Sequence, residues 1–514
     1  MLTGSGGSRK GATLSGRRFR LTAACVIALV GACAAPAPAG APRYSIAYAT
    51  LLGGGEWDQA REIIVGADGT VLVGGQTCSA DFPATADAVQ PKYAGDDPAL
   101  GHGGIYGGDC FLARLSADGS KVLAATFFGG SKQERNVYGM ALDRQGRIVI
   151  CSATRSPDCP TTPGCFQPKY GGPPSDWMVA KVSADLGKLI WCTYVGGSGD
   201  DFPRGGLALD AEDNVVIVGE SHSPDFPTTP GAFQEKPGGP QDAAIVKLKA
   251  DGSGLAWATR LGGSAGEGSM GVRIDKSGCI YAAGHTRSAD FPVTPGAAQA
   301  RLAGESDCWL ARFSPDGARL LYATLLGGSK NEFAEHRLWL YEDGSVLLTG
   351  SAGSPDFPTT PGAVRPATFG KTAGFLAKLA PDGRRFVFSA LVGGSAGGFW
   401  LMPTPDSAGN ILLVGQTSSP DLPVTPDALQ MKYGGGQGDG ALAILSPDGS
   451  RLLYCSYLGG SGDDMVRSVA LGPAGELYLV GNTSSPDFPA APSAAQAKHR
   501  GKGDAFVLKL VPAK

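Results

Sequence analysis

The chain has 514 residues, of which 42% are hydrophobic and 18% are charged, and its formal net charge at pH 7 is -3. Its 79 glycines and 37 prolines exceed average usage, but they fall at repeated positions between apolar runs, which excludes a disordered chain. A mildly acidic protein is a poor match for nucleic acid, and we expect no nucleic-acid partner.

The first 34 residues differ in kind from the rest of the chain. Five basic residues precede the apolar run LTAACVIALVGACA at 21–34, which is too short to span a membrane comfortably. This pattern predicts a secretory signal peptide over residues 1–34, whose removal changes the formal net charge from -3 to -8. Residues 35–43, rich in Pro and Ala, predict a short stiff linker.

Two outcomes of signal-peptide cleavage are open. The stretch LVGAC at 29–33 resembles a bacterial lipobox, in which Cys33 is lipidated and becomes the new N-terminus. Cleavage at the A-x-A-like site Ala32-Cys33-Ala34, without a lipid, is the alternative. We therefore expect an exported protein in the extracellular space, the periplasm or, as a lipoprotein, the outer membrane, with membrane contact only through a lipid on Cys33.

From residue 44 onward one loop motif recurs, and SPDFPTTPGAFQ at 223–234 is a well-formed copy. Its aspartate is found seven times, at Asp81, Asp158, Asp225, Asp290, Asp356, Asp421 and Asp487. The successive spacings are 77, 67, 65, 66, 65 and 66 residues, so repeats of about 67 residues account for all of 44–514. Self-similarity at a fixed period outranks local signals and indicates a single repeat domain.

Each repeat predicts four antiparallel strands. In the last repeat, 468–483 reads as two apolar alternating runs joined by a turn, and DAFVLKL at 504–510 follows the loop motif. A fourth strand follows a tight Asp-Gly turn, as in SPDGSRLLYCSYLGG at 446–460. A four-stranded sheet cannot bury both faces alone, whereas a ring of seven sheets lets each pack on two neighbours. We therefore predict an all-β fold, a seven-bladed β-propeller of four-stranded antiparallel blades.

The two ends of the repeat region predict how the ring closes. YSIAYATLL, Tyr44–Leu52, matches fourth strands such as LYATLLGG at 321–328, whereas the last repeat stops after its third strand. We expect the N-terminal strand to complete the seventh blade by pairing with Val507–Leu510.

The repeat also resembles a known family, the bacterial SBBP repeats, which are β-propeller repeats of exported proteins. The resemblance is carried by the YATLLGGS-type segment, the hairpin turn at Asp213-Asn214, the VGxTxSPDFP stretch and the DAFVxKL strand, and it covers 44–510. It implies the propeller fold, and it implies hardly any particular activity.

The recurring loop itself is interpreted as structural. In the copy from Ser223, Asp225 is placed to accept backbone N–H bonds from a turn, and Phe226 anchors the loop on the blade. Thr229-Pro230 resembles an N-cap followed by the first residue of one helical turn. A residue needed once for chemistry has no reason to occur seven times.

The second repeat alone carries cysteines in this loop. Cys159 and Cys165 replace the Phe and the Ala of the motif, and this paired change predicts a disulfide, which export makes chemically reasonable. No CxxC or Cys/His metal spacing is present in the sequence.

The segment that begins with Gly-Gly and joins the fourth strand to the next first strand carries a second repeated signal. If the first strand is innermost, these GG loops and the SPDFP loops share one face. Their sixth position is acidic in six repeats: Asp58, Glu134, Asp201, Glu267, Glu332 and Asp464. Six carboxylates near a channel mouth would repel one another, and calcium is the cation expected to relieve this repulsion. The alternative is that each acid caps its own turn or pairs with a base such as Arg61, Arg204 or Arg467.

Departures from repeat symmetry on the same face indicate a ligand site. The sixth repeat replaces the acid with GGFWLM, which brings Phe399 and Trp400 to this position. Three bases, Arg155, His222 and Arg287, occupy equivalent positions in adjacent blades, and we expect this arc to engage an acidic glycan. The competing interpretation is that these are exposed bases without a specific role.

The catalytic signals are thin. The five histidines do not share repeat positions, none lies in a recognisable Ser/His/Asp arrangement, and the GGS segments lack the GK[ST] of a phosphate loop. We interpret the protein as a monomeric, non-catalytic, exported binding scaffold for carbohydrate or protein on the face with the GG and SPDFP loops. A propeller-type polysaccharide lyase or hydrolase is the alternative.

Overall fold

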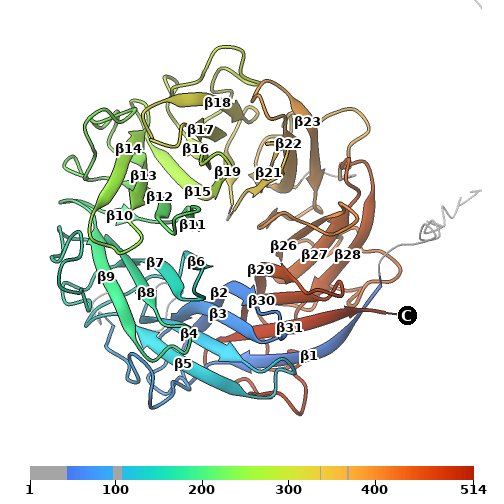
Figure 1. Ribbon diagram of the computed structural model, residues 1–514. Helices are drawn as coiled ribbons and strands as arrows, with labels where there is room; N and C mark the ends of the chain where they lie inside the picture. The colour runs from blue at the N-terminus through green and yellow to red at the C-terminus, as the bar shows by residue number, and fades with distance from the viewer. Residues whose placement is uncertain (1–42, 97–106, 336, 367–369, 514) are drawn as a thin grey trace, which may run out of the picture. The chain divides into compact units, whose positions relative to one another are not determined.

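The alternating apolar residues of each repeat form strands, and the strands form a ring of sheets. The computed structural model describes residues 43–96, 107–335, 337–366 and 370–513, which all belong to the unit Ala37–Lys514. Seven antiparallel sheets follow one another around the ring (Figure 1), which confirms the predicted seven-bladed β-propeller. The predicted signal peptide, the lipobox and linker residues 35–42 lie outside the described residues. No helix long and apolar enough to cross a membrane occurs in the described part of the chain.

We number the blades along the chain and give their strands from the ring axis outward. Blade 1 contains β2 (Asp58–Val65), β3 (Val71–Thr77), β4 (Asp109–Leu115) and β5 (Val122–Phe128). Blade 2 contains β6 (Gly139–Leu142), β7 (Ile148–Thr154), β8 (Asp176–Val182) and β9 (Leu189–Val195). Blade 3 contains β10 (Asp201–Phe202) and β11 (Leu207–Leu209), then β12 (Val215–Ser221), β13 (Asp242–Leu248) and β14 (Leu255–Leu261). Blade 4 contains β15 (Glu267–Ile274), β16 (Ile280–Thr286), β17 (Asp307–Phe313) and β18 (Leu320–Leu326).

The remaining blades follow the same order. Blade 5 contains β19 (Glu332–Ala334) and β20 (Trp339–Leu340), then β21 (Val346–Ala352), β22 (Ala373–Leu379) and β23 (Phe386–Val392). Blade 6 contains β24 (Gly398–Trp400) and β25 (Thr404–Pro405), then β26 (Ile411–Thr417), β27 (Asp439–Leu445) and β28 (Leu452–Leu458). Blade 7 contains β29 (Asp464–Leu471), β30 (Leu477–Thr483), β31 (Asp504–Pro512) and β1 (Tyr44–Leu52).

The innermost strand is split into two short pieces in blades 3, 5 and 6. In blades 3 and 6 the break contains a proline, Pro203 and Pro403 respectively. Proline has no N–H to donate to the neighbouring strand, so the ladder cannot continue through it.

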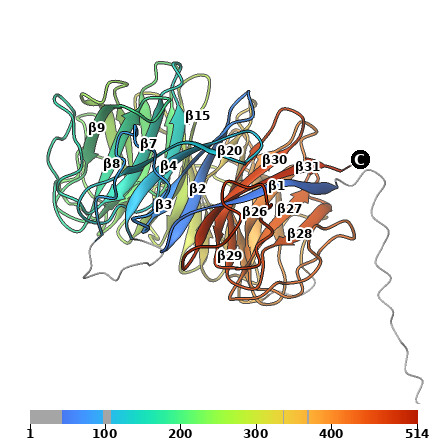
Figure 2. The ribbon, with the colours of Figure 1, turned by 90° about the horizontal axis from the view of Figure 1, so that it is seen from below.

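The N-terminal strand closes the ring. β1 pairs antiparallel with β31, in a register that runs from Tyr44 opposite Pro512 to Leu52 opposite Ala505. Figure 2 shows the two strands side by side. The predicted closure is therefore confirmed, and blade 7 is built from both ends of the repeat region.

The hydrophobic core consists of seven clusters, each lying between two neighbouring blades. The cluster between blades 4 and 5, for example, includes Tyr322, Phe357 and Phe375, all of them buried. Because successive residues of a strand point to opposite faces, each blade contributes one set of side chains to the preceding cluster and the other set to the next. Each large apolar side chain buried in this way stabilises the fold by about 1.5–3 kcal/mol.

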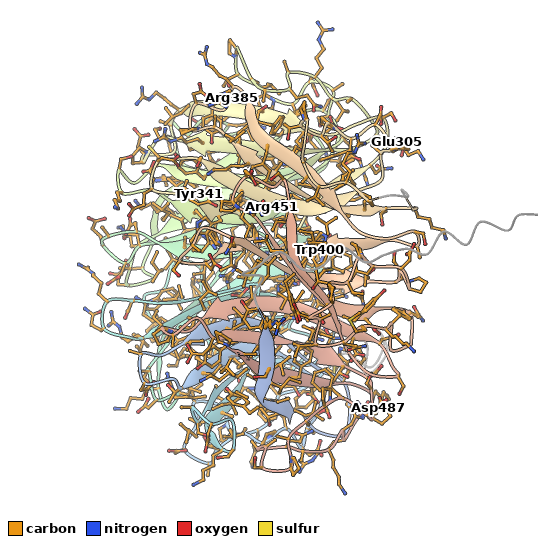
Figure 3. The ribbon with its side chains drawn as sticks, turned by 90° about the vertical axis from the view of Figure 1, so that its right-hand side faces the viewer. Glu305, Tyr341, Arg385, Trp400, Arg451 and Asp487 are labelled. Carbon is orange, nitrogen blue, oxygen red and sulfur yellow. The ribbon has the colours of Figure 1, made fainter. Side chains whose placement is uncertain are left out.

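The two faces of the ring carry different connections. The GG and SPDFP loops lie at one end of the strands, which we call the loop face, and the short turns lie at the other end, the turn face. In Figure 3 the loop-face residues Glu305 and Asp487 lie toward the right of the view, and the turn-face residues Tyr341 and Arg385 lie toward the left. Arg451 also belongs to the turn face, because it ends the turn between β27 and β28.

Candidate functional site

The aspartate of the SPDFP motif holds the GG loop of its own blade. Asp225 Oδ1 accepts hydrogen bonds from the backbone N–H and the hydroxyl of Ser198, both at 2.8 Å. The backbone bond recurs in all seven blades, with donor–acceptor distances of 2.8–3.0 Å from Gly55, Ser131, Ser198, Ser264, Ser329, Ser395 and Ser461. The predicted role of Asp225 is confirmed, and the loop repeats because every blade needs the same connection to its incoming chain.

Replacing this aspartate tests its contribution. Asp225→Ala removes both hydrogen bonds to Ser198, and we expect a loss of about 1 kcal/mol in the free energy of unfolding, because an exposed hydrogen bond contributes about 0.5–1.5 kcal/mol. Thermal unfolding and amide hydrogen exchange at Ser198 measure the effect. Glu212→Ala, at an exposed turn-face residue, is the control, and equal unfolding of the two variants would contradict the assignment.

The six acids of the GG loops are buried at the bases of their loops. All six are 0% exposed. Asp58 Oδ2 accepts hydrogen bonds from Gly54 N and Ser79 Oγ, both at 2.8 Å. Asp201 repeats this arrangement with Gly197 N and Ser223 Oγ, also at 2.8 Å. Each acid thus caps its own turn, which was the alternative interpretation of these residues.

Each GG-loop acid also lies next to an aspartate of the preceding blade. The partners are the first residues of third strands, and the six pairs are Asp504/Asp58, Asp109/Glu134, Asp176/Asp201, Asp242/Glu267, Asp307/Glu332 and Asp439/Asp464. A Cβ at Gly53 would lie 2.5 Å from Asp504 Oδ1 and 2.6 Å from Asp58 Oδ2, so only glycine fits beside the pair. Asp58 Oδ1 and Asp504 Oδ1 have no hydrogen-bond partner among the described residues.

Burial makes these carboxyls weak acids. It raises the pKa of Asp58 and Asp176 to about 7 and that of Asp109 to about 8, and the neighbouring carboxylate adds to the shift in Asp58 and Asp176. It also raises the pKa of Asp307 and Asp439 to about 6. One proton shared by two carboxyls removes the repulsion between them.

The interface between blades 5 and 6 lacks both acids of the pair. Ala373 and Gly398 stand at the two positions, and the ring of Trp400 fills the neighbouring space. Trp400 is 3% exposed, and its Nε1–H donates to the carbonyl of Val392 at 2.9 Å. The expectation that Trp400 contacts a ligand is therefore corrected, because its side chain is a core residue between two blades (Figure 3).

The burial of the six acids between blades also changes where a calcium ion bound by them is expected. The acids Asp58, Glu134, Asp201, Glu267, Glu332 and Asp464 are distributed over six separate interfaces. No group of three or more His, Cys, Asp or Glu side chains suited to a metal ion occurs within the described ranges. A calcium ion bound by these residues would be shared by one pair of carboxylates between two blades, and would not sit at the channel mouth.

The three bases of the predicted arc lie on the loop face of blades 2, 3 and 4. His222 and Arg287 are exposed and Arg155 is half-buried. Each is fixed through its backbone N–H. That of Arg155 donates to the carbonyl of Gln133 at 2.8 Å, and those of His222 and Arg287 donate to the carbonyls of Asp200 and Gly266, both at 3.0 Å. His222 Nδ1 also lies 3.0 Å from the carbonyl oxygen of Asp200. The structure thus presents these side chains on one face, each held by its own blade.

The predicted disulfide between Cys159 and Cys165 is absent, because both residues are buried free thiols. Cys159 takes the inward position that Phe226 occupies in blade 3. Its Sγ lies 3.1 Å from Thr154 Oγ1 and 3.7 Å from Glu134 Oε1. The replacement of the motif residues therefore repacks the interior beneath the loop.

A cavity of about 240 Å³ lies on the ring axis. It is lined by residues of the innermost strands and the segments beside them, among them Arg61, Arg135, Arg204, Arg467, Glu335 and Phe399. Phe399 was expected to contact a ligand, and it lines this cavity. The exposed fraction of the Arg204 side chain, 42%, shows that the cavity reaches solvent.

The arginines of this cavity are aimed by irregularities in the strands. β2 has a bulge between Ala60 and Glu62, and β29 has one between Val466 and Ser468, so Arg61 and Arg467 lie outside the regular ladder. A bulge redirects a side chain that would otherwise follow the pleat. Arg467 Nε donates to Asn482 Oδ1 at 3.2 Å, which fixes its direction.

These side chains were not predicted to form a site from the sequence. Arg61, Arg204 and Arg467 were considered as partners for the GG-loop acids, and Arg135 and Glu335 were not considered. The signal was present, because Arg61, Arg204, Glu335 and Arg467 all stand three residues after the sixth position of the GG segment. Comparing the repeats at this position shows that cationic, acidic and apolar residues are unequally distributed around the axis.

A larger hollow of about 400 Å³ lies on the turn face between blades 4 and 5. Four of its five charged side chains form ion pairs: Arg312 lies 2.8 Å from Asp275, and Lys276 lies 2.9 Å from Glu342. The fifth, Asp343, accepts hydrogen bonds from the backbone N–H and the hydroxyl of Ser345. The hollow therefore lacks the group of like charges that lines the axial cavity.

Comparisons with known proteins concern the fold alone. No family model and no curated protein matches the chain. Similar solved structures include BamB from Moraxella catarrhalis, at 12% identity and a TM-score of 0.36 over 91% of this chain and 99% of that one. Hydrazine synthase from Kuenenia stuttgartiensis is 11% identical, with a TM-score of 0.42 over 84% of this chain and 92% of its own. The polysaccharide lyase Uly1 is 8% identical, with a TM-score of 0.44 over 92% of this chain and 99% of its own.

Proposed function

We propose that this protein is an exported, non-catalytic binding scaffold that takes a carbohydrate or protein partner on its loop face. The observation that supports the proposal is a division between residue classes. The residues that repeat in the loops are engaged in contacts within the ring, whereas side chains that differ between blades line the axial cavity and stand on the loop face around it. Side chains that differ between blades are the ones that can make a specific site on a symmetric scaffold.

Export, and a lipid on Cys33, belong to the same proposal. The basic and apolar N-terminal segment and the resemblance to SBBP repeats of exported proteins support them. A surface-located ring of seven packed blades offers a rigid platform, so that a ligand meets side chains already held in place.

Binding measurements with loop-face variants test this proposal. We expect a glycan array or a pull-down with the chain from residue 43 onward to yield a ligand, whose affinity falls about 10-fold or more in Arg287→Glu or Phe399→Ala, since one good charged or packed contact contributes about 1.5–3 kcal/mol. Arg451→Glu on the turn face is the matched control. Binding that depends on Arg451 and not on the loop-face residues would place the site elsewhere.

The competing function is a propeller-type polysaccharide lyase or hydrolase. Incubation with a panel of polysaccharides distinguishes it, because cleavage releases new reducing or unsaturated ends and simple binding does not. Release of such ends in amounts that grow with time would overturn the non-catalytic proposal.

A further inference from the structure

The axial cavity has an excess of positive charge on one side. Four arginines come from four consecutive blades: Arg467 from blade 7, Arg61 from blade 1, Arg135 from blade 2 and Arg204 from blade 3. Among the described residues that line the cavity, blade 5 contributes one carboxylate, Glu335, from the opposite part of the ring. Arg204 also lies 3.8 Å from Glu220. Of the lining residues that the structure describes, four are arginines and one is a glutamate.

Arg61 is the most deeply placed of these residues. It is 7% exposed, and its Nε–H has no hydrogen-bond partner among the described residues. Its guanidinium lies 4.6 Å from the centre of the Tyr138 ring, and that of Arg135 lies 4.4 Å from the centre of the Phe202 ring. Stacking on an aromatic ring holds a guanidinium in one plane, so that its N–H donors are directed within that plane.

The arginines act on one another within this cavity. Burial lowers the pKa of Arg61 to about 9, and the charges of Arg467 and Arg204 lower it further, whereas Tyr138 and Glu335 oppose the shift. Arg61 therefore stays charged at neutral pH, although its charge is costly there. An anion placed among these groups would relieve this cost.

The cavity also contains groups suited to the neutral part of a ligand. Asn136 is 4% exposed, and its Oδ1 is a buried acceptor without a partner in the described part of the chain. A hydroxyl group of a ligand can donate to it. Phe399 and Leu401 of blade 6 form an apolar side of the cavity, which suits the face of a sugar ring.

The size of the cavity limits the ligand. Its volume of about 240 Å³ is below the roughly 300–1,000 Å³ of sites that enclose drug-sized molecules. Glu62 of β2 and Arg337, between β19 and β20, form an ion pair that joins blades 1 and 5 across the ring axis. A small group fits here, and a long oligosaccharide does not.

We propose that the axial cavity binds one acidic sugar residue of the uronic acid type, with its carboxylate on the arginines and a hydroxyl on Asn136. Arginine forks match the two oxygens of a carboxylate, and four of them converge on this space. This inference rests on the proposed scaffold function and names the ligand class of its central site.

Isothermal titration with sodium glucuronate, glucose and inorganic sulfate tests the ligand class. We expect binding of glucuronate that weakens with added salt, at least about 10-fold weaker binding of glucose, and weaker binding of sulfate than of glucuronate. Equal affinity for glucose would overturn the inference, and so would sulfate that binds as tightly as glucuronate, because the site would then recognise any small anion.

Two variants with opposite expected effects distinguish binding from folding. Arg467→Gln is expected to weaken glucuronate binding about 10-fold or more, as for a lost charge-assisted hydrogen bond. Glu335→Gln removes the acid facing the arginines and is expected to strengthen binding several-fold, which damage to the fold would not do. Arg451→Gln, on the turn face, is the control. Unchanged affinity in both cavity variants would overturn the inference.

Failure of this inference is distinguishable from failure of the proposed function. A chain that binds a neutral glycan or a protein, with dependence on Arg287, and gives no heat with glucuronate keeps the scaffold function and refutes the acidic sugar in the cavity. A chain that binds neither refutes both.

Discussion

Removal of the N-terminal strand is expected to unfold the entire ring. A chain that begins at residue 54 lacks β1, whose residues pair with β31 from Tyr44 to Leu52. It loses the burial of Tyr48, Leu51 and Leu52, which contribute about 1.5–3 kcal/mol each, and it exposes the apolar face of β31. The sum is comparable to the about 5–15 kcal/mol of net stability that folded proteins possess. Differential scanning calorimetry and circular dichroism measure the loss.

The matched control is a chain that begins at Arg43, the first described residue, which retains all of β1. We expect it to unfold in one cooperative transition, and we expect the shorter chain to lack that transition or to show it at a much lower temperature. A synthetic peptide of residues 43–53 should restore part of the stability of the shorter chain by pairing with β31. Identical unfolding temperatures for the two chains would refute closure by β1.

The second large effect expected is a loss of stability as the pH rises from about 5 to about 8.5. Folding raises the pKa of the paired carboxyls, for example that of Asp58 from 3.8 to about 7, so the folded chain binds protons more tightly than the unfolded chain in this range. Their contribution is complete below the unfolded pKa and is lost as the pH rises through 6–8. Each pKa unit corresponds to about 1.4 kcal/mol, so the raised pKa values of Asp58, Asp109, Asp176, Asp307 and Asp439 together amount to several kcal/mol.

Two other sets of groups limit stability on the acid side. Hydrogen bonds from Ser198 lower the pKa of Asp225, so the contribution of this aspartate is lost as the pH falls below about 4. Burial lowers the pKa of His285 to about 3, so its contribution is lost as the pH falls from 6.5 towards that value. We therefore expect the unfolding temperature to pass through a maximum near about pH 5–6.

Asp58→Asn tests the assignment to the pairs. The amide keeps an oxygen for Gly54 N and Ser79 Oγ and supplies a donor for Asp504, which imitates the protonated acid. We expect the variant to be more stable than the parent protein at pH 8.5 and to depend less on pH. Asp68→Asn, at an exposed turn where hydrogen bonds lower the pKa of the acid, should leave the pH dependence between pH 5 and 8.5 unchanged. A stability that rises steadily between pH 5 and 8.5 would refute the paired, protonated state.

Calcium offers a second way to neutralise the same pairs. If the carboxylates share a cation, millimolar calcium should raise the unfolding temperature at pH 8.5 and have little effect at pH 5, where the pairs hold protons. Asp58→Asn should reduce this calcium effect. No shift with calcium at pH 8.5 would leave the shared proton as the means of neutralisation and refute the calcium proposal.

The sequence by itself determined the architecture. A repeat of about 67 residues with four alternating runs has few ways to bury both faces of its sheet. The last repeat stops after its third strand, and Tyr44–Leu52 has the sequence of a fourth strand, so the two ends of the repeat region pair with each other. The function of Asp225 was also readable, because its bond to Ser198 is a local turn contact that every copy of the loop repeats. Period and local hydrogen-bonding chemistry are properties of the chain alone, so they can be derived without coordinates.

Only the tertiary structure decided what lies between blades and on the axis. Asp58 meets Asp504 across 446 positions of sequence, and no local pattern shows that the two carboxyls are buried together. Cys159 and Cys165 are near neighbours in the chain, yet the interior packing turns the Cys159 thiol toward Thr154. The arginines of the axial cavity come from four blades, and bulges aim two of them. Such contacts depend on which faces the closed ring brings together, which is a property of the assembled blades and not of any one repeat.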